Sequence, residues 1–158
     1  MSDKQAPTRV LIVEDENIVR KGLRRLLEDL PDFEIVGDTE FGEDAIEIVQ
    51  DQAPDVVLLD MLLLTSQLSG LDTLKQIVRL SPSTRVVVLS VYSDEATVFP
   101  ALQAGAIGYI LKSAPLSEVS EAILDAAHGR YHLDPVITKK LIERAPSAST
   151  VGQTASAE

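Results

Sequence analysis

A run of branched apolar residues near the middle of the chain ends in an acid, VVLLD at residues 56–60. A continuous apolar run of this length is typical of a parallel β-strand buried on both faces by helices. The carboxyl edge of such a sheet is where open α/β folds bind their ligands. Asp60 is therefore the first candidate for a chemical role, although aspartate in this place also commonly caps a turn.

Four further apolar runs occur along the chain, at residues 9–13, 33–36, 85–89 and 108–111. Segments with apolar residues at helical spacing separate the runs, at residues 17–30, 44–52, 69–80, 94–104 and 115–128, and residues 37–42 are expected to form a loop. The alternation predicts an α/β domain with a doubly wound, five-stranded parallel sheet. Pro100 lies inside the fourth helical segment and removes a hydrogen bond there, so this helix either begins late or is kinked.

One more helix is expected after the sheet. Asp134 and Pro135 are a typical N-cap and first-turn pair, and an apolar stripe follows at Val136, Ile137, Leu141 and Ile142. We divide the chain into a flexible N-terminus at 1–7, the α/β domain at 8–129, a linker helix at 130–144 and a disordered tail at 145–158.

The charge and the cysteine content exclude several classes of function. The formal net charge of −11 would repel nucleic acid and anionic lipid, so the chain alone is not expected to bind DNA. The absence of cysteine excludes disulfides, thiolate nucleophiles and cysteine-ligated metals. Residues 1–8 lack the apolar run of a signal peptide, and residues 56–64 are too short to cross a bilayer. We therefore expect a cytoplasmic protein without a membrane partner.

Polar residues end four of the predicted strands: Glu14 with Asp15, Asp60, Ser90 and Lys112. A parallel sheet places these ends on one edge, so the side chains are expected to converge. Clustered carboxylates bind Mg²⁺, which prefers oxygen ligands and keeps waters that a phosphate can replace. With such a metal, Asp60 could attack a phosphoryl group and form an aspartyl phosphate. Lys112 and Ser90 would then contact the phosphoryl oxygens as a point charge and a hydrogen-bond donor.

Four motifs at these strand ends resemble a known family. They are VLIVEDE at 10–16, LLD at 58–60, VLS at 88–90 and AGAIGYILK at 104–112. In this order they resemble the receiver domain of two-component response regulators, from about residue 8 to residue 128. The resemblance implies a flavodoxin/CheY-like (βα)5 fold and phosphorylation of Asp60 by a sensor histidine kinase. It implies a conformational switch rather than an enzyme, with only self-catalysed phosphoryl transfer to Asp60 and slow autodephosphorylation.

The resemblance also implies a metal site around the phosphoacceptor. Mg²⁺ would be held by Asp15, Asp60 and the backbone carbonyl of Leu62, with Glu14 close by through water. Lys112 would be the catalytic cation beside it.

A switch pair is implied by the same resemblance. Ser90 and Tyr109 would report phosphorylation to the surface formed by the fourth helix, the fifth strand and the fifth helix. For a lone tyrosine on a strand, a core position without a switching role is the alternative. Leu62 and Tyr92 would rim the site, where they could tune the lifetime of the phosphoryl group.

Residues 129–135 and the helix after them resemble the link that precedes a helix-turn-helix in the NarL/FixJ (LuxR-type) class. In that class a DNA-binding transcription-regulator domain would follow, so the chain is expected to be either a fragment or a stand-alone receiver. DNA would be bound only through that missing domain. A homodimer could form through the fourth helix, fifth strand and fifth helix, or through the C-terminal helix, whose stripe could equally pack on its own receiver.

Two stretches depart from the family pattern. Leu64 and Leu68 stand where the family usually has proline and glycine, and the glycine comes at Gly70, so this loop is about two residues longer. Lys112 is followed by Ser113 instead of proline, and a cis peptide bond is not assumed there because it costs roughly 2.5–4 kcal/mol without proline.

Two alternative functions remain open from the sequence. A phosphatase of the haloacid dehalogenase kind also forms an aspartyl phosphate, but it carries a second acid where this chain has Leu62. A phosphate-independent interaction module is favoured by the longer loop. His128 and His132 are expected on the surface rather than at a metal, and the cluster at 20–25 is expected to be a solvated helix face beside which a sensor kinase could dock.

Overall fold

The computed structural model describes residues 6–144 and shows the predicted alternation of strands and helices. The elements in chain order are β1 (Thr8–Val13), α1 (Asn17–Glu28), β2 (Phe33–Thr39), α2 (Gly42–Gln52), β3 (Val56–Asp60), α3 (Gly70–Leu80), β4 (Arg85–Ser90), α4 (Glu95–Gln103), β5 (Gly108–Leu111), α5 (Leu116–Ala127), β6 (His132–Leu133) and α6 (Pro135–Arg144). The doubly wound α/β fold with an extra C-terminal helix is therefore confirmed.

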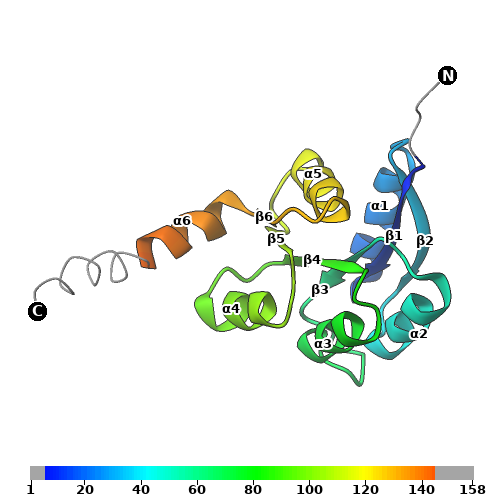
Figure 1. Ribbon diagram of the computed structural model, residues 1–158, viewed down its shortest axis with the longest axis horizontal. Helices are drawn as coiled ribbons and strands as arrows, with labels where there is room; N and C mark the ends of the chain where they lie inside the picture. Colours follow the sequence, from blue (N-terminus) through cyan, green and yellow to red (C-terminus); the bar gives the residue numbers. More distant parts are fainter. Residues whose placement is uncertain (1–5, 145–158) are drawn as a thin grey trace, which may run out of the picture.

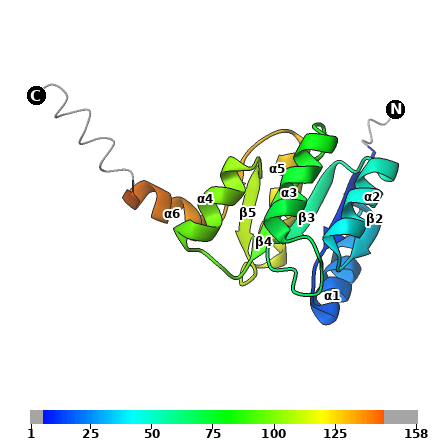
Figure 2. The ribbon, with the colours of Figure 1, turned by 90° about the horizontal axis from the view of Figure 1, so that it is seen from below.

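The strands form one parallel sheet in the order β2-β1-β3-β4-β5-β6. Figures 1 and 2 show α1 and α5 on one face of the sheet and α2, α3 and α4 on the other. The strand order reverses at β1, which pairs with β2 on one side and with β3 on the other. Ligands of open α/β sheets bind outside the carboxyl ends of strands at such a switch point, so the topology places the ends of β1 and β3 where a site is expected.

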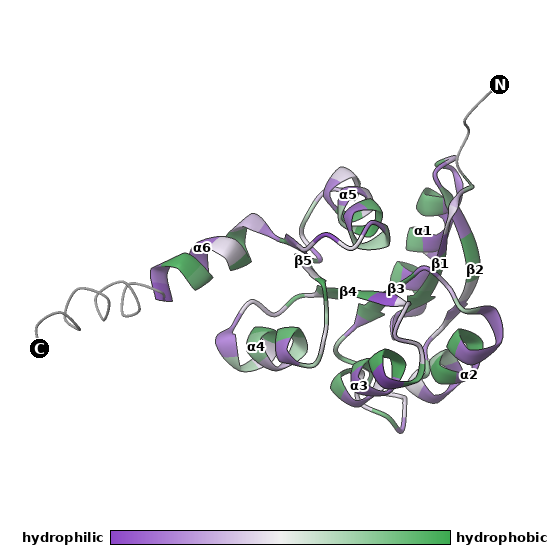
Figure 3. Cartoon of the chain, viewed as in Figure 1, coloured by the Kyte–Doolittle hydropathy of each residue, from purple (hydrophilic) through white to green (hydrophobic). Residues whose placement is uncertain are grey.

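The central strands are buried on both faces. Successive side chains of a strand point to opposite faces; accordingly Val57 and Leu59 of β3 pack with α2, α3 and α4, whereas Val56 and Leu58 pack with α1 and α5. Figure 3 shows hydrophobic residues along these strands, while the helices carry both hydrophobic and hydrophilic residues. Asp60 ends this buried strand and is itself only 4% exposed. The apolar run was thus a correct signal for a doubly covered strand.

Several boundaries differ from the prediction, and one of them is the start of α2, which lies at Gly42 rather than at residue 44. β2 continues to Thr39 because residues 37–39 pair with residues 11–13 of β1, so the loop predicted at 37–42 is much shorter. α4 begins at Glu95, after Asp94 whose carbonyl accepts the backbone N–H of Val98, so Pro100 lies inside the helix. A late start of this helix is therefore wrong.

The C-terminal segment contains a strand that the sequence pattern did not predict. β6 is two residues long and pairs with β5, so the sheet has six strands and not five. Within the segment at 130–144, α6 begins at Pro135, as the predicted N-cap and first-turn pair requires. Asp134 caps α6 as predicted, because its Oδ1 accepts the N–H of Val136, and its Oδ2 accepts the N–H of Leu111 in β5. Residues 1–5 and the predicted tail at 145–158 lie outside the described residues. Within residues 6–144, no helix combines the length and the apolar character needed to cross a membrane.

His132 in β6 is half-buried, and its expected surface position is wrong. Its Nδ1 lies 2.8 Å from Asp125 Oδ2, and its Nε2 lies 2.8 Å from Glu118 Oε2, both on α5. Partial burial disfavours the imidazolium, but these two hydrogen bonds outweigh it and raise the pKa of His132. The same contact with His132 lowers the pKa of Asp125.

Candidate phosphorylation site

Four strand ends meet at the carboxyl edge of the sheet and enclose a small cavity. The cavity has a volume of about 200 Å³ and is lined by Asp15, Glu16, Asp60, Leu62, Leu64, Val91 and Lys112. These residues come from the ends of β1, β3, β4 and β5 and the loops that follow them. The convergence predicted from the strand ends is therefore present, at the switch point of the sheet.

A single lysine lies between two buried carboxylates at this edge. Nζ of Lys112 donates to Asp60 Oδ2 over 3.1 Å and to Glu14 Oε2 over 3.2 Å. The side chains of Glu14 and Asp60 are only 2% and 5% exposed, and that of Lys112 is 17% exposed. The other oxygen of Asp60, Oδ1, accepts the backbone N–H of Leu62. The peptide bonds of residues 6–144, that after Lys112 included, are trans.

Burial and charge shift the protonation equilibria of this cluster. Burial, with the negative charge of Asp60 adding to it, raises the pKa of the Glu14 carboxyl, although hydrogen bonds from Glu16 N–H and from Lys112 oppose the rise. For Lys112, burial disfavours the ammonium form, but its hydrogen bond to Glu14 and the charge of Asp60 outweigh burial and raise its pKa. Lys112 therefore stays charged, and two buried acids share its one positive charge.

The acidic residues match the ligand chemistry of Mg²⁺ without forming a finished cage. Carboxylate and carbonyl oxygens are the ligands that this hard ion prefers. Oε1 of Glu14 is buried and accepts no hydrogen bond from residues 6–144, although Nζ of Lys112 lies 3.0 Å away. No group of three or more acidic, histidine or cysteine side chains in the described part of the chain is arranged to hold a metal. Asp15 explains part of this, since its Oδ1 accepts hydrogen bonds from Thr65 instead.

Ser90 and Tyr109 both bind the backbone of one residue, Tyr92. Ser90 Oγ accepts the N–H of Tyr92 over 3.0 Å, and the hydroxyl of Tyr109 donates to the carbonyl of Tyr92 over 2.7 Å. Ser90 is buried, and Tyr109 has no exposed surface, so the tyrosine lies inside the core. Burial raises the pKa of the Tyr109 phenol. The predicted switch residues are thus joined through the loop between β4 and α4.

The predicted rim residues lie at the edge of the site. Leu62 and Tyr92 are 40% and 42% exposed, and Leu64, at the position where the family usually has proline, is more exposed still. Met61, Leu62 and Tyr92 also line a second, mostly apolar cavity that extends toward α4. The backbone carbonyl of Leu62 is two residues beyond Asp60, as the resemblance requires.

Arg20 is a site neighbour that the sequence reasoning missed. The solvated face expected at 20–25 is wrong for this residue, which is buried and donates through Nη1 to the carbonyl of Glu14 over 2.8 Å. Its Nε donates to Asp38 Oδ1 over 3.0 Å, and a further bond reaches Asn17. Arg20 thereby ties α1 and β2 to the end of β1. The spacing of Asn17 and Arg20 was a usable signal, because residues three apart share a helix face.

Comparison with known proteins agrees with this geometry. Residues 10–124 match the family described as response regulator receiver domain. The chain belongs to this family. The receiver domain in general depends on Mg²⁺ and is not a true enzyme. Membership gives no support to the phosphatase or to the phosphate-independent module.

Individual relatives place this receiver domain in the LuxR and NarL/FixJ class. The chain is 32% identical over 136 residues to the transcriptional regulatory protein LiaR of Bacillus subtilis (strain 168), covering 86% of this chain and 64% of the relative. It is 34% identical over 135 residues to the transcriptional regulatory protein DegU of Brevibacillus brevis, covering 85% and 56%. The chain thus spans less than two thirds of the length of these relatives.

Solved structures show the same receiver fold. The receiver domain of the putative response regulator NarL from Mycobacterium tuberculosis superposes with a TM-score of 0.74 at 33% identity, over 80% of this chain and all of that chain. A LuxR-family two-component response regulator from Aurantimonas sp. SI85-9A1 superposes with a TM-score of 0.81 at 28% identity, over 87% of this chain and 97% of that chain. The CheY-like fold is therefore shown by structure as well as by sequence.

Proposed function

We propose that this receiver domain is phosphorylated on Asp60 by a sensor histidine kinase and acts as a conformational switch. The observation that carries the proposal is the position of Lys112, whose Nζ reaches Asp60 Oδ2 and the buried Glu14 at the edge of the sheet. A lysine at this position offsets the negative charge of the carboxylates around the nucleophile. It can also contact an oxygen of an arriving phosphoryl group. The cavity beside Asp60 supplies room for that group.

The proposed reaction is a phosphoryl transfer from histidine to aspartate. A carboxylate oxygen of Asp60 attacks the phosphorus atom of the kinase phosphohistidine, and a new P–O bond forms as the P–N bond breaks. The imidazole leaves with the electron pair of that bond and recovers a proton from solvent. In the product, Lys112 pairs with one phosphoryl oxygen and the Ser90 hydroxyl donates to another. Hydrolysis by water later restores the carboxylate and releases inorganic phosphate.

The residues that would hold Mg²⁺ are Asp15, Asp60 and the backbone carbonyl of Leu62, with Glu14 reached through water. When bound, the ion supplies positive charge that offsets the repulsion between carboxylates and phosphoryl oxygens. The buried Oε1 of Glu14 accepts no hydrogen bond from residues 6–144, and Glu14 shares the one cation, Lys112, with Asp60, so the two acids favour a second cation at this corner.

Phosphorylation is proposed to act on the loop between β4 and α4. Ser90 Oγ accepts the N–H of Tyr92, and a phosphoryl group on Asp60 would draw the hydroxyl toward it as a donor. Tyr109 holds the carbonyl of Tyr92. Movement of Ser90 therefore reaches Tyr92 and the start of α4, while Leu62 and Tyr92 at the rim limit access of water to the phosphoryl group. This gives the switch pair a route to the α4, β5 and α5 surface.

The output is proposed to be control of transcription. LiaR and DegU are named transcriptional regulatory proteins, and the chain matches over half of their length. The formal net charge of −11 makes direct DNA binding by this chain unfavourable, so DNA would be bound by a helix-turn-helix domain after the receiver. A homodimer through α4, β5 and α5, or through α6, is the proposed way in which phosphorylation reaches that domain.

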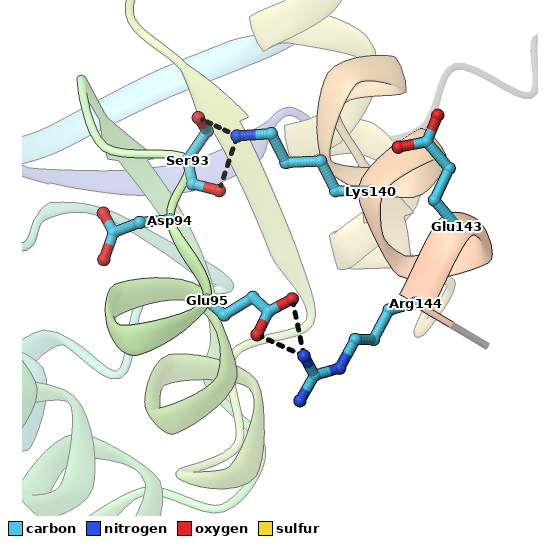
Figure 4. A pocket seen from close by; sticks show the side chains of 6 residues that line it. All are labelled: Ser93, Asp94, Glu95, Lys140, Glu143 and Arg144. Atoms are coloured by element: carbon cyan, nitrogen blue, oxygen red, sulfur yellow. Dashed lines mark hydrogen bonds and ion pairs between the residues drawn. The ribbon is translucent and has the colours of Figure 1, made fainter. Parts of the chain in front are cut away.

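α6 is proposed to be the linker helix between these two units. Figure 4 shows that Lys140 reaches Ser93 and that Arg144 reaches Glu95, at the start of α4. Ile137 is buried and packs with the core on the α4 side, whereas Ile142 stays exposed. The apolar stripe predicted for this helix is therefore divided, one part packing on its own receiver and one part available to a partner.

Intact mass measurement tests the proposed phosphorylation. Incubation with acetyl phosphate and Mg²⁺ should add one phosphoryl group to the wild type, and omission of Mg²⁺ should abolish the gain. Asp60→Asn removes the nucleophile but keeps the shape of the side chain, so it should gain no mass under the same conditions.

A second phosphodonor guards against a false negative. A receiver that does not react with acetyl phosphate can still accept a phosphoryl group from a kinase. A phosphorylated sensor histidine kinase is therefore the second donor in the same experiment. Failure of the wild type with both donors, or an equal gain by Asp60→Asn, would contradict the proposal.

A further inference from the structure

Thr65, in the loop between β3 and α3, contacts the carboxylate that is expected to bind the metal. Its hydroxyl donates to Asp15 Oδ1 over 2.8 Å, and its backbone N–H donates to the same oxygen over 3.3 Å. One loop residue thus supplies two donors to one oxygen of a proposed metal ligand.

The loop that carries Thr65 is anchored on α2. Ser66 Oγ accepts the N–H of Gly42 over 2.8 Å and donates to Glu43 Oε1 over 2.8 Å. A Cβ atom at Gly42 would lie 3.1 Å from Cβ of Leu68, so the loop packs closely against the start of this helix. Thr65 is therefore held beside Asp15 by neighbouring contacts.

The ends of the same loop lie against each other. Gly70 approaches the backbone of Met61 so closely that a Cβ atom would overlap its carbonyl group. Because the two ends are held together, the additional residues of this longer loop lie in the segment between them. Thr65 lies midway between the two ends, at the point that reaches the loop after β1.

We infer that Thr65 lowers the affinity of the metal site, because it competes with Mg²⁺ for Asp15. The inference rests on the proposed function, because it needs Asp15 as a ligand. Mg²⁺ demands near-octahedral geometry with oxygens at about 2.0–2.1 Å. Asp15, Glu16 and Asp60 line one cavity, but within residues 6–144 no three such side chains are arranged to hold a metal, and Oδ1 of Asp15 is engaged by Thr65. An ion bound through this oxygen would have to displace one or both hydrogen bonds from Thr65.

Magnesium titration of Thr65→Val tests the competition. Valine has nearly the same shape but no hydroxyl, so the variant should bind Mg²⁺ about five-fold more tightly than the wild type when measured by isothermal titration calorimetry. Thr65→Ser keeps the donor and should retain the wild-type Kd. In the wild type, saturating Mg²⁺ should also speed hydrogen exchange of the Thr65 amide, because its bond to Asp15 is broken. If Thr65→Val binds Mg²⁺ equally or more weakly, Thr65 supports the ligand and the inference is overturned.

Two further variants separate this inference from the proposed function. Thr97→Val is the matched control, since Thr97 also donates its hydroxyl to a carboxylate, that of Asp94, but outside the site; it should leave the Kd unchanged. Asp15→Asn should abolish Mg²⁺ binding at this site both in the wild-type background and in combination with Thr65→Val. Absence of Mg²⁺ binding in all variants would overturn the proposed metal site as well, whereas normal binding with no gain in Thr65→Val overturns only the role of Thr65.

Discussion

The carboxyl edge of the sheet, around Lys112, and the attachment of α6 both use ion pairs of nearly the same length, yet the pairs differ in burial. Lys112 lies 3.0 Å from Glu14 and 3.1 Å from Asp60, and Arg144 lies 2.9 Å from Glu95. The side chains of the two acids at the edge are at most 5% exposed, whereas those of Arg144 and Glu95 are 59% and 44% exposed. The distance between the charges therefore does not show which ion pair contributes more to stability.

Burial decides what each pair contributes. Removing one partner of a buried pair leaves a charge that water cannot solvate, which commonly costs about 3–5 kcal/mol. An exposed pair loses little, because water and salt replace the partner, and typical values are about 0.2–1 kcal/mol. The edge is therefore expected to be sensitive to single substitutions, and the α6 attachment to be tolerant and easily released.

The largest effect is expected for Lys112→Met. Methionine keeps much of the side-chain length but leaves Glu14 and Asp60 without their shared cation. The free energy of unfolding at pH 7 should fall by about 3 kcal/mol, measured by urea denaturation without metal. A loss under about 1 kcal/mol would show that water already solvates this edge.

The pH dependence of the same variant provides its control. The pKa of Glu14 in the folded protein is raised above its ordinary value of 4.5. The stabilisation that protonated Glu14 contributes is therefore complete below pH 4.5 and is lost as the pH rises through the pKa of the folded state. The defect of Lys112→Met should therefore shrink as the pH falls toward 4.5, and Mg²⁺ at pH 7 should restore part of it.

Arg20→Gln should have the next largest effect. The substitution removes hydrogen bonds to Asp38 and to the carbonyl of Glu14, both partly or fully buried. A loss of about 2 kcal/mol in the free energy of unfolding is expected from the unpaired acceptors. Arg25→Gln, on the exposed part of the same helix, is the matched control and should change stability by less than about 0.5 kcal/mol. Equal effects of the two variants would contradict the buried role of Arg20.

His132 should make the attachment of β6 depend on pH. Its pKa is raised in the folded protein, so its contribution is fully present below pH 6.5 and is lost as the pH rises through the folded value. Stability should fall by about 1 kcal/mol across this window, and His132→Gln should remove that dependence. Side-chain NMR titration should give a pKa above 6.5 for His132. His128→Gln is the control, and a pH profile that follows His128 instead would contradict the assignment.

Arg144→Gln should have the smallest effect on global stability. The pair with Glu95 is largely exposed, so the change in unfolding free energy should stay below about 0.5 kcal/mol. Hydrogen exchange within α6 should nevertheless become faster, most clearly at low salt, where the wild-type pair is least screened. A global loss comparable to that of Lys112→Met would remove the contrast between the two regions.

Local patterns along the chain were sufficient to predict most of the fold. The apolar runs at β1, β3, β4 and β5 were recognised because parallel strands covered on both faces must be apolar throughout. β6 was not, because two residues carry no periodicity and their pairing with β5 is set by a neighbouring strand. The end of β2 was placed too early for a related reason, since its polar residues pair with β1.

The groups that meet at the carboxyl edge follow from the chain alone, because a parallel sheet brings its strand ends together whatever the loops do. Glu14, Asp60, Ser90 and Lys112 could therefore be placed from their positions after the strands. The contact between Asp15 and Thr65 could not, because it depends on the path of a loop anchored elsewhere. The burial of Arg20, the two carboxylates around His132 and the docking of α6 were likewise decided by packing between distant segments. Periodicity reports which face of an element is buried, but it does not report which polar group from another element lies opposite.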